Sequence, residues 1–109
     1  MEKCLFCKII QNEIPVKKVY ESDKVLGFED IGPQAQTHLL FVHKNHTEHI
    51  NEVSQYDATQ LVDIFQAIRS YTQENKLEKE GFRVVTNVGK NAGQTVFHTH
   101  FHVLGGEKL

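Results

Sequence analysis

Three histidine residues occur at every second position near the end of the chain, in the stretch QTVFHTHFHVLGG: His98, His100 and His102. In an extended strand the side chains alternate between the two faces, so these imidazoles are expected to share one face while the mostly apolar residues between them occupy the other. Imidazole titrates near neutral pH, ligates metals and attacks phosphorus. The pattern therefore indicates a reactive or ligating cluster, and a solvated polar face on an edge strand is the alternative.

The residues just before the three histidines favour a phosphate site. The stretch NVGKNAGQT places Gly89, Gly93 and the hydroxyl of Thr95 immediately upstream of them. Backbone N–H groups of a glycine-rich segment and a hydroxyl donor are the groups that bind phosphate in proteins. We therefore expect a local phosphate-binding site beside the imidazoles.

Composition limits the remaining possibilities. With 109 residues, 39% of them hydrophobic, the chain is expected to form a single domain over residues 1–109. Its formal net charge of -2 gives no overall attraction to nucleic acid or to an anionic membrane, so we expect neither partner. The sequence has no apolar run of about 18 residues and no pattern typical of a signal peptide, which predicts a soluble, cytoplasmic protein.

Hydrophobic periodicity and turn residues predict five strands and two helices. The strands are expected within 17–30, as a hairpin turning at Ser22 and Asp23, and over 36–43, 81–89 and 96–105. The helices are expected over 4–14 and from 57 to about 79, the second with Ser54 as its N-cap and Gly81 as its stop. This order predicts an α+β fold, in which helices cover one face of an antiparallel sheet and leave the other face for a site.

The long predicted helix carries more apolar residues than one core-facing stripe requires. They are Ala58, Leu61, Val62, Ile64, Phe65, Ile68 and Tyr71. A small domain cannot bury so wide a surface by itself, so part of this helix is expected to meet a partner subunit.

The stretch HTHFHVL resembles the His-x-His-x-His-x-x signature of the histidine triad (HIT) superfamily. Four further stretches, CKIIQNEIPVKKVYE, GFEDIGPQAQTHLLFVHKNH, VVTNVG and GGEKL, resemble its Hint-type purine nucleoside phosphoramidase branch. Together they cover nearly the whole chain in the right order. The resemblance implies a HIT-like fold, a five-stranded antiparallel sheet with two helices, which joins a second copy across a two-fold axis into a homodimer with a continuous sheet.

The resemblance also implies a catalytic set of His98, His100 and His102. His100 matches the family's nucleophile, which attacks the α-phosphorus and forms a nucleotidyl-histidine intermediate without a metal. His102 would contact the phosphate oxygens and help to move a proton to the leaving group. The implied function is hydrolysis of the P–N bond of purine nucleoside phosphoramidates. A dinucleoside polyphosphate hydrolase and a non-catalytic nucleotide-binding module are the alternatives.

Nucleotide-binding residues also follow from the resemblance. The implied set is Asn87, Gly93, Gln94, Thr95 and His102 at the phosphate, Asp30 at the ribose, and Phe6, Ile9, Phe28 and Ile31 around the purine. Each has a plainer interpretation. Asp30 also suits a turn before Gly32 and Pro33, Asn87 also suits the end of a strand, and the apolar residues also suit an ordinary core.

A possible metal site involves both cysteines of the chain. Two cysteines three residues apart, without an export signal, favour a metal or free thiols over a disulfide. Cys4, Cys7, His46 and His98 resemble the zinc set of HIT proteins that begin with Cys-x-x-Cys. Two thiolates and two imidazoles would make a closed tetrahedral site, so the zinc would be structural, and buried free thiols are the alternative. The remaining histidines are expected at the surface: His38, His43 and His49.

Overall fold

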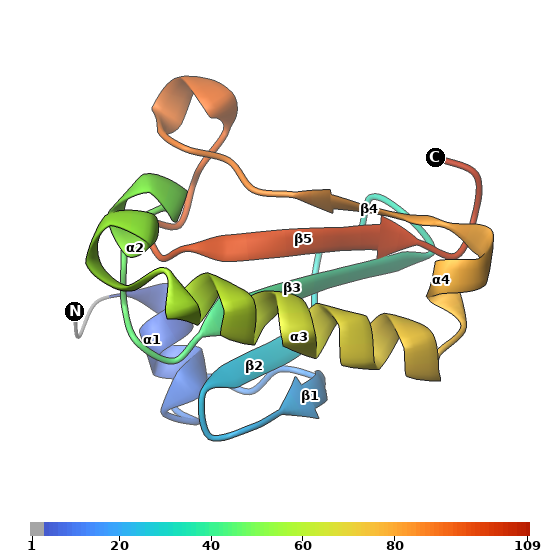
Figure 1. Ribbon diagram of the computed structural model, residues 1–109, viewed down its shortest axis with the longest axis horizontal. Coiled ribbons are helices and arrows are strands. Elements are labelled where there is room, and N and C mark those ends of the chain that lie inside the picture. Colours follow the sequence, from blue (N-terminus) through green and yellow to red (C-terminus); the bar gives the residue numbers. More distant parts are fainter. Residues whose placement is uncertain (1–3) are drawn as a thin grey trace.

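The structure, a computed structural model, describes residues 4–109, which form one five-stranded antiparallel sheet with helices packed on it (Figure 1). The strands lie in the order β1-β2-β3-β5-β4. Their bounds are Lys18–Glu21 for β1, Val25–Glu29 for β2, Thr37–His43 for β3, Phe82–Val85 for β4 and His100–Gly105 for β5. The predicted α+β class and the five antiparallel strands are confirmed.

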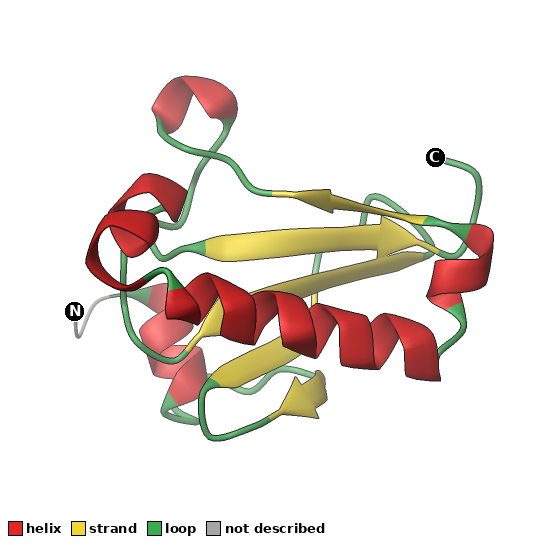
Figure 2. Ribbon diagram, in the orientation of Figure 1, coloured by secondary structure: helices red, strands yellow, loops and turns green. Residues whose placement is uncertain are grey.

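The helices are more numerous and shorter than the sequence predicted. They are α1 (Leu5–Ile10), α2 (Ile50–Asp57), α3 (Thr59–Glu74) and α4 (Leu77–Glu80), with a 3-10 turn over Lys90–Ala92. Figure 2 shows α3 as the long helix that lies in front of the sheet and runs roughly along its long strands. Within the described residues, none of these helices is both long and apolar enough to cross a membrane.

The predicted N-cap of the long helix is wrong. Ser54 lies inside α2, where its hydroxyl donates to the carbonyl of Asn51. The break between α2 and α3 comes at Asp57 instead, whose carboxylate accepts from the backbone N–H and the hydroxyl of Thr59. A side chain that binds the backbone two residues later competes with continued helix, so the two segments separate. The predicted stop is correct only for α4, which is followed by Gly81 with φ 101°, because the long helix α3 already ends at Glu74.

The two faces of the sheet carry separate apolar clusters. On one face, Phe41 and Phe101 pack against Ile64 and Ile68 of α3. On the opposite face, Phe6 and Ile9 of α1 pack against Leu26, Phe28, Leu40 and Val42. The prediction that the helices share one face is therefore wrong. The helix α1 has only six residues, so it covers part of the second face and leaves space beside it.

Close packing inside the sheet requires one glycine. A Cβ atom added to Gly27 would lie 2.7 Å from Cε2 of Phe41, which pairs with Gly27 across β2 and β3. The Phe41 side chain is fully buried. Real Cβ atoms do not approach a carbon atom this closely, so the Phe41 ring packs over Gly27 only because no side chain is there.

The last strand is shorter than predicted and begins at His100. Residues just before it bind the loop after β3 instead of a neighbouring strand. The N–H of Thr99 donates to the carbonyl of Thr47 over 2.7 Å, and the two threonine hydroxyls are also 2.7 Å apart. His98 therefore lies outside the strand that carries the other two histidines.

Candidate functional site

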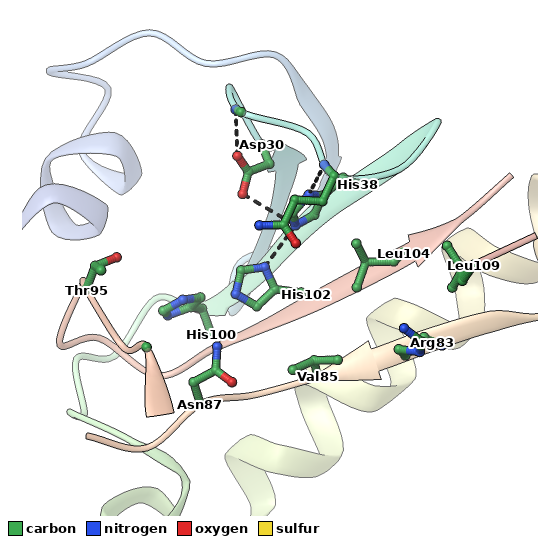
Figure 3. A pocket seen from close by; sticks show the side chains of 13 residues that line it. Asp30, His38, Arg83, Val85, Asn87, Thr95, His100, His102, Leu104 and Leu109 are labelled. Carbon is green, nitrogen blue, oxygen red and sulfur yellow. Dashed lines mark hydrogen bonds and ion pairs between the residues drawn. The ribbon is translucent and has the colours of Figure 1, made fainter. Parts of the chain in front are cut away.

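His100 and His102 lie where two cavities meet on the face of the sheet that carries α1. One cavity, of about 360 Å³, has mostly apolar walls. The other, of about 580 Å³, is drawn in Figure 3 and is called the polar cavity here, because most of its walls are polar and only Val85, Leu104 and Leu109 form an apolar part. Asp30 and Thr95 also border both. The imidazoles therefore lie between two compartments, an arrangement that suits a ligand with two chemically different halves.

The apolar cavity contains the residues expected around a purine. Phe6, Ile9 and Phe28 are buried and form its walls. The ring of Phe6 also meets the ring of His100 edge to face, with centroids 4.9 Å apart. Ile31 borders the cavity as well, but its side chain is 97% exposed. The first three residues belong to the α1 core cluster, so they serve both as core and as cavity wall.

The polar cavity collects most of the residues expected around a phosphate. Asn87, Gly93 and Thr95 line it together with His100 and His102. Within residues 4–109 the hydroxyl of Thr95 has no hydrogen-bond partner, and the residue is exposed. Thr95 therefore has a free donor at the boundary between the two cavities.

Gln94 lies outside the walls of both cavities. Its side-chain oxygen accepts from the N–H of Gly89 over 2.8 Å, and its side-chain nitrogen donates to the carbonyls of Glu48 and Val96. Its own N–H donates to the carbonyl of Gly89. These bonds use the polar groups of Gln94 to brace the loop that presents Gly93 and Thr95.

A backbone hydrogen bond determines which nitrogen of His100 is free. Nδ1 of His100 lies 2.7 Å from the carbonyl oxygen of His98. A carbonyl only accepts, so Nδ1 carries the proton and Nε2 has the lone pair. Burial lowers the pKa of His100, which keeps the ring neutral at neutral pH. His100 therefore has an unprotonated nitrogen at the junction of the two cavities.

A second chain of contacts orients His102 (Figure 3). Nδ1 of His38 accepts from the N–H of Gln34 over 3.0 Å, so Nε2 of His38 carries the proton. Nε2 lies 2.9 Å from Nδ1 of His102 and 3.4 Å from a carboxylate oxygen of Asp30. His102 therefore accepts at Nδ1 and has its own N–H at Nε2. Burial, with smaller contributions from His100 and His38, lowers the pKa of His102.

Asp30 makes the expected turn contact and also lies at both cavities. One carboxylate oxygen accepts from the N–H of Gly32 over 2.7 Å, which is the turn contact. The other oxygen lies near His38, at the border of both cavities. The carboxylate therefore stabilises its turn and still faces the cavities.

The expectation that His38 and His43 lie at the surface is wrong. Each of these two residues is 6% exposed, and Nε2 of His43 lies 3.1 Å from a carboxylate oxygen of Asp63. His38 reaches the site because β3 pairs with β5, which places it on the face that carries His102. The sequence contained a signal for this position, because His38 lies an even number of residues from the apolar Leu40 and Val42 and therefore shares their strand face. The signal could be interpreted only once β5 was known to pair with β3. His49 is half-buried.

Cys4, Cys7, His46 and His98 come together at the N-terminal end of α1. Their ligand atoms lie within 4.8 Å of one another, so the group could hold a metal ion. Cys4 is also the N-cap of α1, because its sulfur accepts from the N–H of Cys7. Both cysteines are free thiols, and burial and the adjacent Cys4 raise the pKa of Cys7 to about 11.

His98 is fully buried, and both of its ring nitrogens have defined directions. Nε2 donates to the carbonyl of His43 over 2.9 Å, so Nδ1 is the lone-pair nitrogen. Nδ1 faces the sulfur atoms of Cys4 and Cys7 at 3.4 and 3.6 Å. Burial lowers the pKa of His98 to about 4, so the ring is neutral, as a metal ligand must be.

The chain is similar to known proteins over nearly its whole length. The family model described as HIT domain matches residues 11–109. An uncharacterized HIT-like protein of Rickettsia prowazekii is 37% identical over 106 residues, which are 96% of this chain and 88% of the relative. The purine nucleoside phosphoramidase of Escherichia coli is 35% identical over 108 residues, 99% of this chain and 91% of that enzyme.

The fold also matches a solved structure closely. A HIT family hydrolase from Clostridium thermocellum superimposes with a TM-score of 0.95 at 39% identity. The match covers 100% of this chain and 95% of that hydrolase.

Proposed function

The chain belongs to the HIT domain family, and we propose that it hydrolyses the P–N bond of purine nucleoside phosphoramidates with His100 as the nucleophile. The observation that carries this proposal is the bond from Nδ1 of His100 to the carbonyl of His98, which leaves Nε2 free between the two cavities. The name of the Escherichia coli relative supports the choice of leaving group.

The reaction proceeds in two steps. Nε2 of His100 attacks the α-phosphorus, the N–P bond of the nucleotidyl-histidine forms, and the bond to the leaving amine breaks. The amine takes a proton as it leaves, and the N–H at Nε2 of His102 is the group that we assign to donate it. Water then attacks the phosphorus, the N–P bond to His100 breaks, and one proton of the water returns to Nε2 of His102 while the other leaves with the phosphate product. The products are the free amine and the nucleoside monophosphate, and Nε2 of His100 is unprotonated again.

The two cavities hold the two halves of the substrate. The purine lies in the apolar cavity among Phe6, Ile9 and Phe28. The Asp30 carboxylate accepts from the ribose hydroxyls, and Thr95 and the loop at Gly93 bind the phosphate oxygens. Donors held in place before the reaction stabilise the charge that develops on the phosphoryl oxygens. The amine leaves into the polar cavity.

Zinc is the metal that we propose for the four-residue cluster. In a tetrahedral zinc site, bonds of about 2.3 Å to sulfur and about 2.0 Å to nitrogen place these atoms about 3.5 Å apart. The S to N distances of Cys4, Cys7, His46 and His98 are 3.3, 3.4 and 3.6 Å, which fits this geometry. The bond from His98 to the carbonyl of His43 supports a ligating Nδ1. Zinc would deprotonate the thiols and fix α1 against the strand region.

A homodimer is the assembly that we propose. Val62 and Phe65 on α3 are 51% and 48% exposed, and Val84 on the edge strand β4 is 40% exposed. β4 pairs only with β5 within the described residues, so its other edge has free backbone groups. A second copy that meets α3 and β4 would cover both features and extend the sheet.

Single-turnover labelling with an adenosine phosphoramidate tests the mechanism. Wild-type protein should form a covalent nucleotidyl adduct, and His100→Ala and His100→Asn should form none. Their kcat should fall on the order of 10⁴-fold while nucleotide affinity changes little. His49→Ala is the matched control, because His49 lies outside both cavities and the cysteine cluster. If His100→Ala kept more than about a tenth of the wild-type turnover, the nucleophile would be another group.

A further inference from the structure

Arg83 lies at the end of the polar cavity away from Asp30 (Figure 3). Its position follows from strand pairing, in which Val85 is opposite His102 and Arg83 is opposite Leu104. Residues opposite each other share a face, so Arg83 projects on the same face as His102, two residues further along the strand. Two residues of strand span about 7 Å, a distance that the long arginine side chain can partly cover.

The charge of Arg83 has no partner in the described part of the chain. None of the ion pairs and side-chain hydrogen bonds of residues 4–109 involves it. It is also the only lysine or arginine among the residues that line the two cavities. The only acidic side chain at the polar cavity, Asp30, is paired with His38 near the other end. An anion is therefore favoured near Arg83 and disfavoured near Asp30.

The surface between His102 and Arg83 is apolar. Val85 and Leu104 cover the strand face there, and Leu109 forms part of the same wall. The side chain of Glu107 accepts from the N–H of Gln36 over 2.6 Å, which connects the segment that carries Leu109 to the residue before β3. A leaving group bound here would contact the apolar surface next to His102, and its far end would lie near the guanidinium of Arg83.

We propose that Arg83 binds a carboxylate on the leaving amine, so that the preferred substrates are nucleoside phosphoramidates of amino acids with small apolar side chains. The inference rests on the proposed function, because it assumes that the amine leaves beside His102. The α-carboxylate of an amino acid is two bonds from its nitrogen, which directs it from His102 toward the guanidinium. Val85 and Leu104 then contact the amino acid side chain. Arginine suits this task because its planar fork matches the two oxygens of a carboxylate.

A pair of substrates that differ only in charge tests the proposal. The two compounds are the adenosine 5′-phosphoramidates of alanine and of alaninamide. For Arg83→Gln, kcat/KM on the alanine compound should fall about tenfold, equal to about 1.4 kcal/mol, while the alaninamide compound changes less than twofold. Arg69→Gln is the control, because Arg69 is the other arginine of the chain and lies exposed on α3. Arg83→Lys should retain part of the preference.

The two substrates also separate failure of this inference from failure of the proposed function. An equal loss on both compounds in Arg83→Gln would make Arg83 structural and overturn the carboxylate assignment. A larger loss on diadenosine tetraphosphate than on the alanine compound would assign Arg83 to polyphosphate and overturn it as well. If wild-type protein hydrolyses neither phosphoramidate, the proposed function fails. Equilibrium binding of the same two compounds then tests the role of Arg83. Wild-type protein should bind the alanine compound more tightly than the alaninamide compound, and Arg83→Gln should lose this preference. Without that difference the carboxylate assignment is wrong.

Discussion

Replacing His38 with alanine tests whether this residue positions His102. Nε2 of His38 is the only described donor to Nδ1 of His102, at 2.9 Å. Without it the His102 ring can turn or place its proton on the other nitrogen, and both changes remove the N–H that serves the leaving amine. His38 itself does not touch the reacting atoms in the proposed mechanism. It acts as a positioning residue, so its loss should lower kcat more than it changes KM.

The expected magnitude follows from the contact. A buried neutral hydrogen bond contributes about 0.5–1.5 kcal/mol net. Its loss removes that much of the preference for the productive orientation and tautomer of His102 over the others. The kcat of His38→Ala should therefore fall about three- to tenfold. A general acid contributes about 10²–10⁴ in rate, so His102→Ala should cost more. His38→Gln is the matched variant, because its amide can still donate to His102, and it should retain most of the activity.

Steady-state kinetics and an NMR titration of His102 measure this effect. His38 helps to lower the pKa of His102, so His38→Ala should raise that pKa toward its ordinary value. A purely structural loss would change the melting temperature without this specific shift. A kcat within twofold of wild type, together with an unchanged pKa of His102, would refute the positioning role.

Three further predictions concern stability, metal and assembly. Gly27→Ala should lower the free energy of unfolding by about 1–3 kcal/mol in chemical denaturation, because its Cβ meets the buried Phe41 ring. Gly32→Ala, whose nearest contact is 3.8 Å away, should cost less, and equal losses would contradict the steric argument. Elemental analysis should find about one zinc per chain, and Cys4→Ser should lose the metal and melt at a lower temperature. Wild-type protein prepared without chelator that contains no zinc would rule the site out. In sedimentation the wild type should be a dimer at micromolar concentration and Phe65→Asp a 12.5 kDa monomer, whereas a monomeric wild type would contradict the assembly.

The sequence predicted those structural elements that depend on residues close together along the chain. The β1–β2 turn was found because Ser22 is a turn residue, and its hydroxyl accepts from the N–H groups of Lys24 and Val25. The helix α2 was missed, because the predicted helix began only at 57 and Ser54, which lies inside α2, was interpreted as its N-cap. Asp57 was the available signal for the break between α2 and α3, since aspartate commonly binds backbone N–H groups at the start of a helix.

Contacts between distant segments explain most of what the sequence did not predict. His38 and His102 are 64 positions apart, and they meet only because β3 pairs with β5 in a particular register. The placement of α1 on the opposite face from α3 has the same origin, because the pattern of Phe6 and Ile9 shows an apolar stripe but not the surface that it covers. The spacing of His100 and His102 was informative because both lie in β5, where strand geometry fixes the direction of each side chain.

His100 and His102 lie on one face of β5, whereas His98 lies before the strand and connects this pair with the cysteine cluster. Its ring faces two thiols through Nδ1, and its backbone carbonyl accepts the proton of His100 that fixes the nucleophile's tautomer. One residue therefore belongs to both the cysteine cluster and the support of the proposed nucleophile. The same cluster includes the N-cap of α1, and Phe6 of that helix packs on the ring of His100. Displacing α1 would thus disturb the apolar cavity and the environment of His100 together, which explains why a cluster outside both cavities can matter for the chemistry between them.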